Sequence, residues 1–203
     1  MSPAAITRSH TRAPGAMATL KSVTAADHDR LERRFDLDRR LRSRPAYAGL
    51  LERMLGFYRP MEALLAPFAV RLDGMDYANR RKVPLLEADL RALGVPDRGA
   101  RLPEAEVLPA VRSPEEAIGI LYVLEGATLG GALIARQARV RLGITALAGG
   151  SFFGAYGTAA GSRWRSFGAA VELLTAGIPT PATCAAAMAC YSGMEAWLCD
   201  DQR

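Results

Sequence analysis

SPEEAIGILYVLEGATLGGALIARQARVR, residues 113–141, is the stretch that decides the fold. Ser113 can cap a helix, Pro114 suits the first helical position, and Glu116 follows the serine by the three residues of a capping box. Apolar residues then run almost without interruption from position 117 to position 135. The stretch therefore predicts one long helix, around which the rest of the chain packs.

Glycines interrupt this apolar run, and each should cost about 1 kcal/mol relative to alanine inside a helix. Gly119, Gly126 and Gly130 are seven and four residues apart, so they share one helical face, and Gly131 follows directly. A face without side chains lets another group approach the backbone closely. Three interpretations compete: a membrane-spanning helix, tight packing against a neighbouring helix, and a pocket for a flat ligand.

Glu125 argues against the membrane interpretation. It stands at the centre of the apolar run, where an acidic residue costs roughly 2.5–3.5 kcal/mol on insertion. Helix packing is then the default, unless a partner site for a ligand occurs elsewhere in the chain.

The composition favours a single all-α domain. The chain has 203 residues, of which 50% are hydrophobic and 23% charged, and alanine, leucine and arginine are abundant. This length is ordinary for one domain, and these residue types favour helices over strands. The formal net charge of +5 suits anionic ligands or an acidic protein partner. The basic residues do not cluster with aromatic ones, so nucleic-acid binding is not indicated.

The three cysteines and the two chain ends indicate a cytoplasmic protein. Cys184, Cys190 and Cys199 form no CxxC pair, which favours a reducing compartment over a zinc site or a disulfide framework. Residues 1–17 contain prolines and arginines but no apolar core of a signal peptide. We therefore expect a flexible N-terminal tail over residues 1–17 and one helical domain over residues 18–203.

The remaining helices follow from apolar spacing and from breakers. Pro60 should kink or interrupt the second of them. Prolines and scattered charges predict a surface connection over residues 96–112, and glycines predict a turn over residues 143–150. The helices expected besides the glycine-containing one cover residues 19–41, 45–72, 79–93, 161–174 and 182–198.

His28 is the one candidate for imidazole chemistry, because the other histidine, His10, lies in the expected tail. The spacing of the apolar residues points His28 inward, where a satisfied core histidine is the plain interpretation. A single histidine cannot build a zinc site, but it can be the axial ligand of a haem iron. Glu32, one turn later, could orient its ring. Basic residues that could meet haem propionates are Lys21, Arg163 and Arg165.

The chain resembles the haem oxygenases, particularly those associated with bacterial phytochromes. LKSVTAADHDRLE, residues 20–32, looks like the proximal helix of that family, and LYVLEGATLGG, residues 121–131, resembles the kinked distal helix of its bacterial branch. FFGAYG followed by RWRSF also looks like that branch. Ala127 stands where the mammalian-type enzymes carry an aspartate, which the bacterial branch also lacks.

The resemblance implies a helical bundle that holds haem between the proximal and distal helices and cleaves it. The products would be biliverdin, carbon monoxide and iron, and the reaction would use O2 and electrons from a ferredoxin, a flavodoxin or an NADPH reductase. A bacteriophytochrome could accept the biliverdin. His28 would bind the iron. The candidate catalytic residues are Gly126, Gly130, Glu125 and Thr128. The candidate haem-binding residues are His28, Lys21, Glu32, Gly126, Gly130, Gly131, Tyr156, Arg163 and Arg165.

Other functions on the same scaffold stay open. A haem carrier or sensor would need His28 and the glycines but no turnover. A di-iron or thiamin-degrading enzyme would need inward carboxylates with Glu-x-x-His spacing, which is absent from the sequence, or a cysteine in a pocket. The meso carbon that is attacked depends on the propionate contacts. A contact between a propionate and Lys21 favours attack at the alpha carbon.

Overall fold

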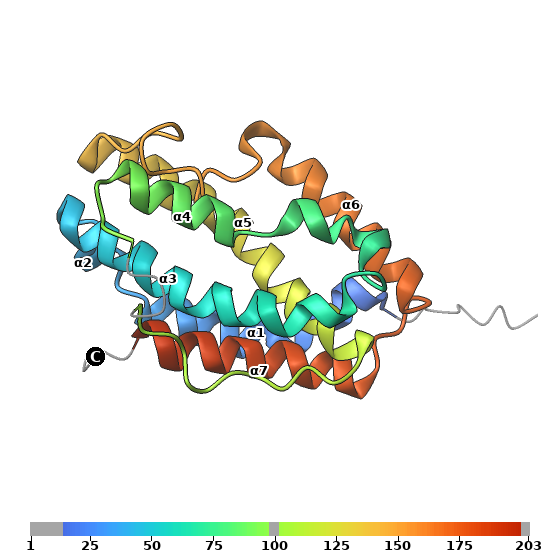
Figure 1. Ribbon diagram of the computed structural model, residues 1–203. Coiled ribbons are helices and arrows are strands. Elements are labelled where there is room, and N and C mark those ends of the chain that lie inside the picture. Colours follow the sequence, from blue (N-terminus) through green and yellow to red (C-terminus); the bar gives the residue numbers. More distant parts are fainter. Residues whose placement is uncertain (1–13, 98–101, 200–203) are drawn as a thin grey trace, which may run out of the picture.

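The computed structural model describes residues 14–97 and 102–199 (Figure 1), and these residues form a helical bundle, as predicted. Within the described ranges, β-structure is limited to isolated bridges at Thr145. His10 lies outside the described residues. The α-helices (α) and 3-10 helices (η) are α1 (Ala16–Arg34), α2 (Leu37–Arg40), α3 (Arg44–Leu65), η1 (Ala66–Phe68), η2 (Asp73–Met75), η3 (Tyr77–Arg80), α4 (Val83–Ala92), α5 (Pro114–Leu142), η5 (Gly157–Ala159), α6 (Ala160–Leu174) and α7 (Pro181–Cys199).

The glycine-containing stretch forms α5, one uninterrupted helix. The Ser113 side chain accepts a hydrogen bond from the Glu116 backbone N–H, and the Glu116 carboxylate accepts one from Arg112 N. Gly143 ends the helix in the left-handed conformation, φ 68°, which glycine adopts without strain. Residues next to the helix therefore determine where it begins and where it ends.

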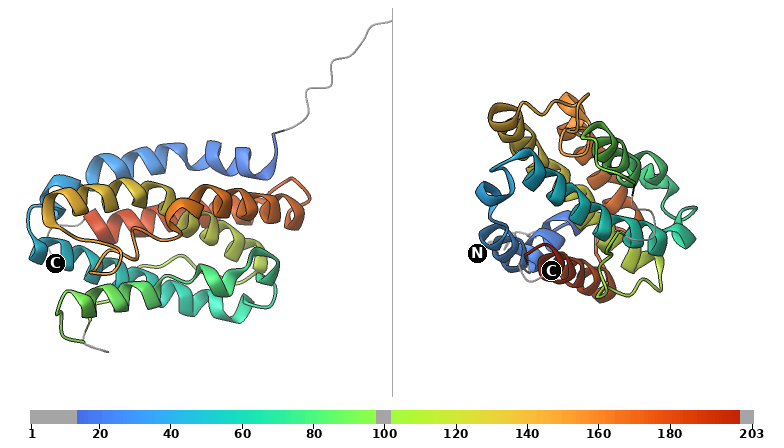
Figure 2. Two further views of the ribbon diagram at one scale, coloured as in Figure 1. Left: turned by 90° about the horizontal axis from the view of Figure 1, so that it is seen from above. Right: turned by 60° about the vertical axis from the view of Figure 1, so that its left-hand side comes forward.

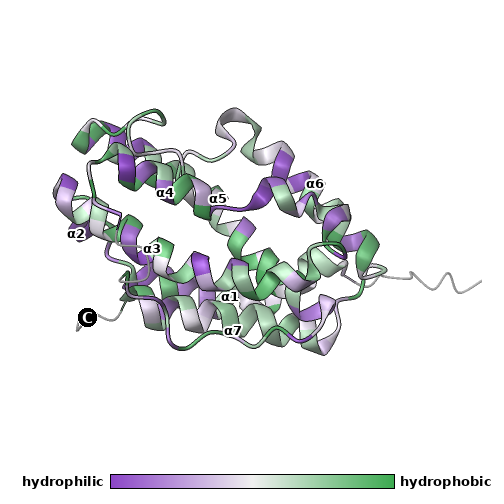
Figure 3. Cartoon of the chain, viewed as in Figure 1, coloured by the Kyte–Doolittle hydropathy of each residue, from purple (hydrophilic) through white to green (hydrophobic). Residues whose placement is uncertain are grey.

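α5 is a core helix of the bundle. It packs against α7 and α6, and α1 packs against α7. Seen from above, α1 runs along one edge of the molecule and α3 with α4 along the other, with α5 and α7 between them (Figure 2). By length and composition α5 could cross a membrane, but 61% of its most apolar window is buried inside the protein. Figure 3 shows hydrophobic residues along α5 and α7.

The first helix differs from the prediction at both ends. It begins at Ala16, three residues early, because the Glu172 carboxylate of α6 accepts hydrogen bonds from Ala16 N (2.9 Å) and Met17 N (3.0 Å). A carboxylate at this position satisfies the free N–H groups of a helix start. The helix ends at Arg34 because Asp36 takes a left-handed conformation, φ 42°, so residues 37–40 form a separate short helix.

Pro60 does not interrupt its helix, so of the two predicted outcomes, a kink or an interruption, the second is wrong. α3 continues through it to Leu65. Proline has no N–H, so the carbonyl of Gly56 four residues earlier is left free. Ala105 N donates to that carbonyl at 3.0 Å, which satisfies it and fixes the long connection after α4 against α3.

The third predicted helix begins four residues late. Residues 77–80 form η3, and α4 starts only at Val83, with Pro84 in its first turn. Arg81 has extended backbone, φ −62° and ψ 136°, which separates the two helices. The predicted surface connection over residues 96–112 is confirmed for its described residues, 96–97 and 102–112, which form no helix or strand. The turn after Gly143 and the helices α6 and α7 are also confirmed.

Candidate functional site

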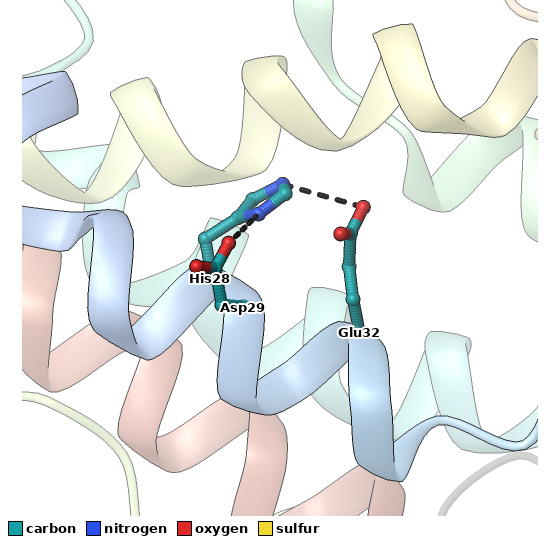
Figure 4. A group of neighbouring side chains, drawn as sticks. All are labelled: His28, Asp29 and Glu32. Atoms are coloured by element: carbon teal, nitrogen blue, oxygen red, sulfur yellow. Dashed lines mark ion pairs between the residues drawn. The ribbon is translucent and has the colours of Figure 1, made fainter.

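His28 extends from α1 toward α5 (Figure 4). The sequence predicts a buried histidine, and this is wrong, because 48% of the side chain is exposed. The ring meets the edge of Tyr191 of α7 at a centroid distance of 5.9 Å. Neither of its two nitrogens forms a hydrogen bond with a described residue. The imidazole is therefore accessible from the space between α1 and α5.

Two exposed carboxylates flank the His28 ring. Asp29 Oδ1 lies 3.7 Å from Nδ1, and Glu32 Oε1 lies 3.7 Å from Nε2. The ligand atoms of the three residues fall within 4.8 Å of one another. A carboxylate near the nitrogen that does not bind a metal orients a histidine ligand, so Glu32 lies where the sequence places an orienting residue.

Gly130 presents open backbone on α5. A Cβ built at this residue would meet no atom within 4 Å, and one at Gly126 would touch only the Trp164 ring, at 3.5 Å. Leu133, on the same face, is 56% exposed, and neighbouring Leu129 is 42% exposed. An apolar ligand that lay against this open backbone would cover these two leucines as well.

α1 and α5 meet one turn before this surface. Thr24 of α1 lies near the Tyr122 hydroxyl of α5, and both residues are buried. Tyr122 is four residues before Gly126, and Thr24 is four residues before His28. The accessible imidazole and the open backbone therefore each lie one turn beyond this contact, where a flat ligand with a metal at its centre would meet both.

Gly119 and Gly131 allow close packing against neighbouring backbone, in contrast to Gly126 and Gly130. A Cβ at Gly119 would collide with the Thr183 carbonyl oxygen of α7, and one at Gly131 would lie 2.9 Å from the Phe153 carbonyl oxygen. Gly131 is also buried. The backbone at Phe153 fills the space in the Cβ direction of Gly131, and the contact of this residue with the cofactor stays a prediction.

Glu125 is buried, and both of its carboxylate oxygens have partners. Oε1 accepts a charged hydrogen bond from Arg80, and Oε2 lies 3.2 Å from Lys82 Nζ and 3.1 Å from the Tyr156 hydroxyl. The Thr128 hydroxyl donates to the Glu125 carbonyl oxygen at 2.6 Å. The two predicted catalytic side chains are thus occupied by contacts within the protein.

The remaining predicted residues divide into two groups. Tyr156 and Arg163 belong to an internal network, in which Arg163 pairs with Asp76 at 2.6 Å and lies over the Tyr156 ring at 4.9 Å. Burial raises the pKa of Tyr156 to about 12. Lys21 and Arg165, by contrast, are exposed, so both can meet an anionic group. Lys21 is seven residues before His28 and shares its helical face.

Sequence reasoning missed Arg80 and Lys82. Both are buried, with side-chain exposures of 1% and 3%. They stand in the short hydrophilic stretch NRRK, which Figure 3 shows at the entrance to α4 and which reads as an ordinary solvated loop. The one nearby residue that indicates structure is Pro84, which predicts that a helix starts there. It does not indicate that Arg80 and Lys82 are buried.

Comparison with known proteins gives consistent matches. Residues 15–177 match the family described as Heme oxygenase. A heme oxygenase of Xanthomonas campestris pv. campestris (strain 8004) is 40% identical over 95 residues, which are 47% of this chain. The match spans about half of that curated relative, 54% of its length. The NO- and CO-bound heme oxygenase of Neisseria meningitidis has the same fold, with a TM-score of 0.70 and 20% identity over 90% of this chain and 88% of that one.

Proposed function

The chain belongs to the haem oxygenase family, as its resemblance predicts, and from this premise we propose that it cleaves haem to biliverdin, carbon monoxide and iron. Haem is both substrate and cofactor: once bound, it supplies the iron that activates O2. The observation that carries the proposal is the juxtaposition of an accessible imidazole at His28 with bare backbone at Gly130.

His28 would bind the iron through an imidazole nitrogen. Glu32 would accept a hydrogen bond from the other nitrogen, after a rotation of the ring or through a water molecule, and would hold the ring in one orientation. A neutral histidine ligand, in contrast to a thiolate, does not push electron density toward O–O cleavage.

Gly126 and Gly130 would lie over the opposite face of the macrocycle. Without side chains they bring backbone carbonyls close to the ring, which restricts the space available to a small ligand and can hold ordered water. Lys21 and Arg165 would receive the propionates, and their positions would set the rotation of the ring and thereby the meso carbon that is attacked.

The basic net charge of +5 suits an acidic electron donor such as a ferredoxin or a flavodoxin. An NADPH reductase could serve as well. A cytoplasmic location and transfer of biliverdin to a bacteriophytochrome complete the proposal.

Titration with haemin, followed by addition of a reductase, NADPH and O2, tests the function. We expect a Soret band that decays as biliverdin appears. A Soret band that persists without biliverdin would identify a haem carrier instead of an enzyme, and the lack of any Soret band would contradict haem binding. His28→Ala should abolish the histidine-ligated spectrum, whereas Cys184→Ser, on α7, should leave it unchanged.

A further inference from the structure

Glu125 is the meeting point of chain segments that are far apart in the sequence. Its carboxylate receives Arg80 from η3, Lys82 from the start of α4 and Tyr156 from the connection between α5 and α6. Lys82 Nζ also donates to the Tyr156 hydroxyl at 2.7 Å and to the Arg80 carbonyl at 2.8 Å. Arg80 reaches α6 as well, through Ser166 Oγ at 3.2 Å.

This network holds α5 from the side away from the glycine surface. Successive residues of an α-helix are rotated by about 100°, so Glu125 points about 100° away from Gly126 and about 140° away from Gly130. Thr128 also lies on the side of α5 away from Gly130, and its hydroxyl donates a hydrogen bond to the Glu125 carbonyl oxygen. Glu125 is therefore placed to fix the helix turn and not to touch a ligand that lies against Gly130.

The network is costly, which argues for a role beyond stability. Buried ion pairs often contribute less than apolar residues of the same size would. Burial lowers the pKa of Lys82, although the neighbouring Glu125 carboxylate opposes this. Tyr156 in addition adopts a left-handed backbone, φ 68°, which a residue with a side chain rarely takes. Strain and buried charge together are typical of a functional site.

The glycines explain why such a support is needed. Gly126 and Gly130 contribute no side chains that could pack α5 in place, and each raises the freedom of the backbone. Charged hydrogen bonds from three directions restrict that freedom without filling the glycine surface.

We propose that Arg80, Lys82 and Tyr156 are positioning residues that act through Glu125 to set the height of the Gly126–Gly130 backbone over the haem. This inference rests on the proposed function and deepens it. In the family resemblance Glu125 is a candidate catalytic residue, and here it becomes the link between the network and the distal helix.

Tyr156→Phe and Lys82→Met test the proposal. The first deletes one hydroxyl group, and the second replaces a buried ammonium by an apolar chain of similar length. Tyr47→Phe is the matched control, because its buried hydroxyl donates to the Gly149 carbonyl oxygen at 2.9 Å, outside the network. Three quantities are measured on the haem complexes: the haemin dissociation constant, the turnover rate with the biliverdin isomer distribution, and the infrared C–O stretch of the ferrous carbon monoxide complex.

We expect both network variants to bind haemin within about threefold of the wild type and to turn over about tenfold more slowly, since small misplacements at a reacting centre are costly. The C–O stretch and the isomer distribution should shift in both, and Tyr47→Phe should match the wild type. Wild-type values for all three quantities in both variants would overturn the inference and leave the proposed function intact. A wild-type protein without a Soret band would instead overturn the proposed function, and the inference with it.

Discussion

Gly119 of α5 lies directly against the Thr183 carbonyl of α7, so close that a Cβ at Gly119 would collide with it. The same helix thus holds one glycine in tight contact with another backbone, Gly119, and one glycine with open space beside it, Gly130. They predict opposite effects of the same substitution.

Gly119→Ala should lower the free energy of unfolding by about 1–3 kcal/mol, because the backbones of α5 and α7 would have to separate. Gly130→Ala should raise it by about 1 kcal/mol, since alanine favours the helix and its Cβ meets no neighbour. Urea unfolding of the haem-free proteins measures both. Equal effects at the two positions would contradict the assignment of the two glycines.

Gly130→Leu should fold normally and lose haem. The added side chain would occupy the surface opposite His28, and we expect at least about a tenfold rise in the haemin dissociation constant, which corresponds to roughly 1.4 kcal/mol. Titration of the Soret band measures it. Leu133→Ala, on the same face, serves as the control that removes volume instead of adding it. Normal haem binding and cleavage by Gly130→Leu would contradict the proposal that the backbone at Gly130 contacts haem.

Glu172→Ala should release the start of the helix that carries His28. Its carboxylate receives the N–H groups of Ala16 and Met17, and loss of such a cap costs about 1 kcal/mol. Thermal unfolding should show the loss, and hydrogen exchange should speed up in the first turn of α1. If exchange rises evenly along α1 instead, Glu172 does not act as a cap.

Glu195 should stabilise the contact of α1 and α7 in a pH-dependent way. Burial by itself raises the pKa of its carboxyl, but hydrogen bonds from Arg34 (2.7 Å) and Arg30 (2.6 Å) outweigh this and hold the pKa below its ordinary value of 4.5. A lowered native pKa means that the stabilisation is complete above the unfolded-state pKa and is lost as the pH falls through the native one.

The wild type should therefore melt about 2–4 °C above Glu195→Gln at neutral pH, a modest difference because both arginines are about half exposed. The difference should shrink as the pH falls below 4.5. Melting curves of both proteins between pH 7 and pH 3.5 give the comparison, and a difference that stays constant over this range would rule out the carboxylate as its source.

Much of the site is recognisable from local sequence. The capping residues, the apolar period and the glycines predict α5, and His28 with Glu32 one turn later predicts the opposing face. Their exposure could not be predicted, because it depends on how α1 and α5 pack against the other helices of the bundle.

The sequence by itself determined the helices, their capping and which residues share a face, because these depend on spacing within one segment. Only the tertiary structure decided which glycine has open backbone and which lies against another backbone, since Gly130 and Gly131 are adjacent and differ only in their neighbours. It also decided the role of Arg80, Lys82 and Glu125. In the sequence the charges of Arg80 and Lys82 read as solvated and Glu125 is a candidate catalytic residue. Their burial in one network follows from the packing of segments more than 40 residues apart.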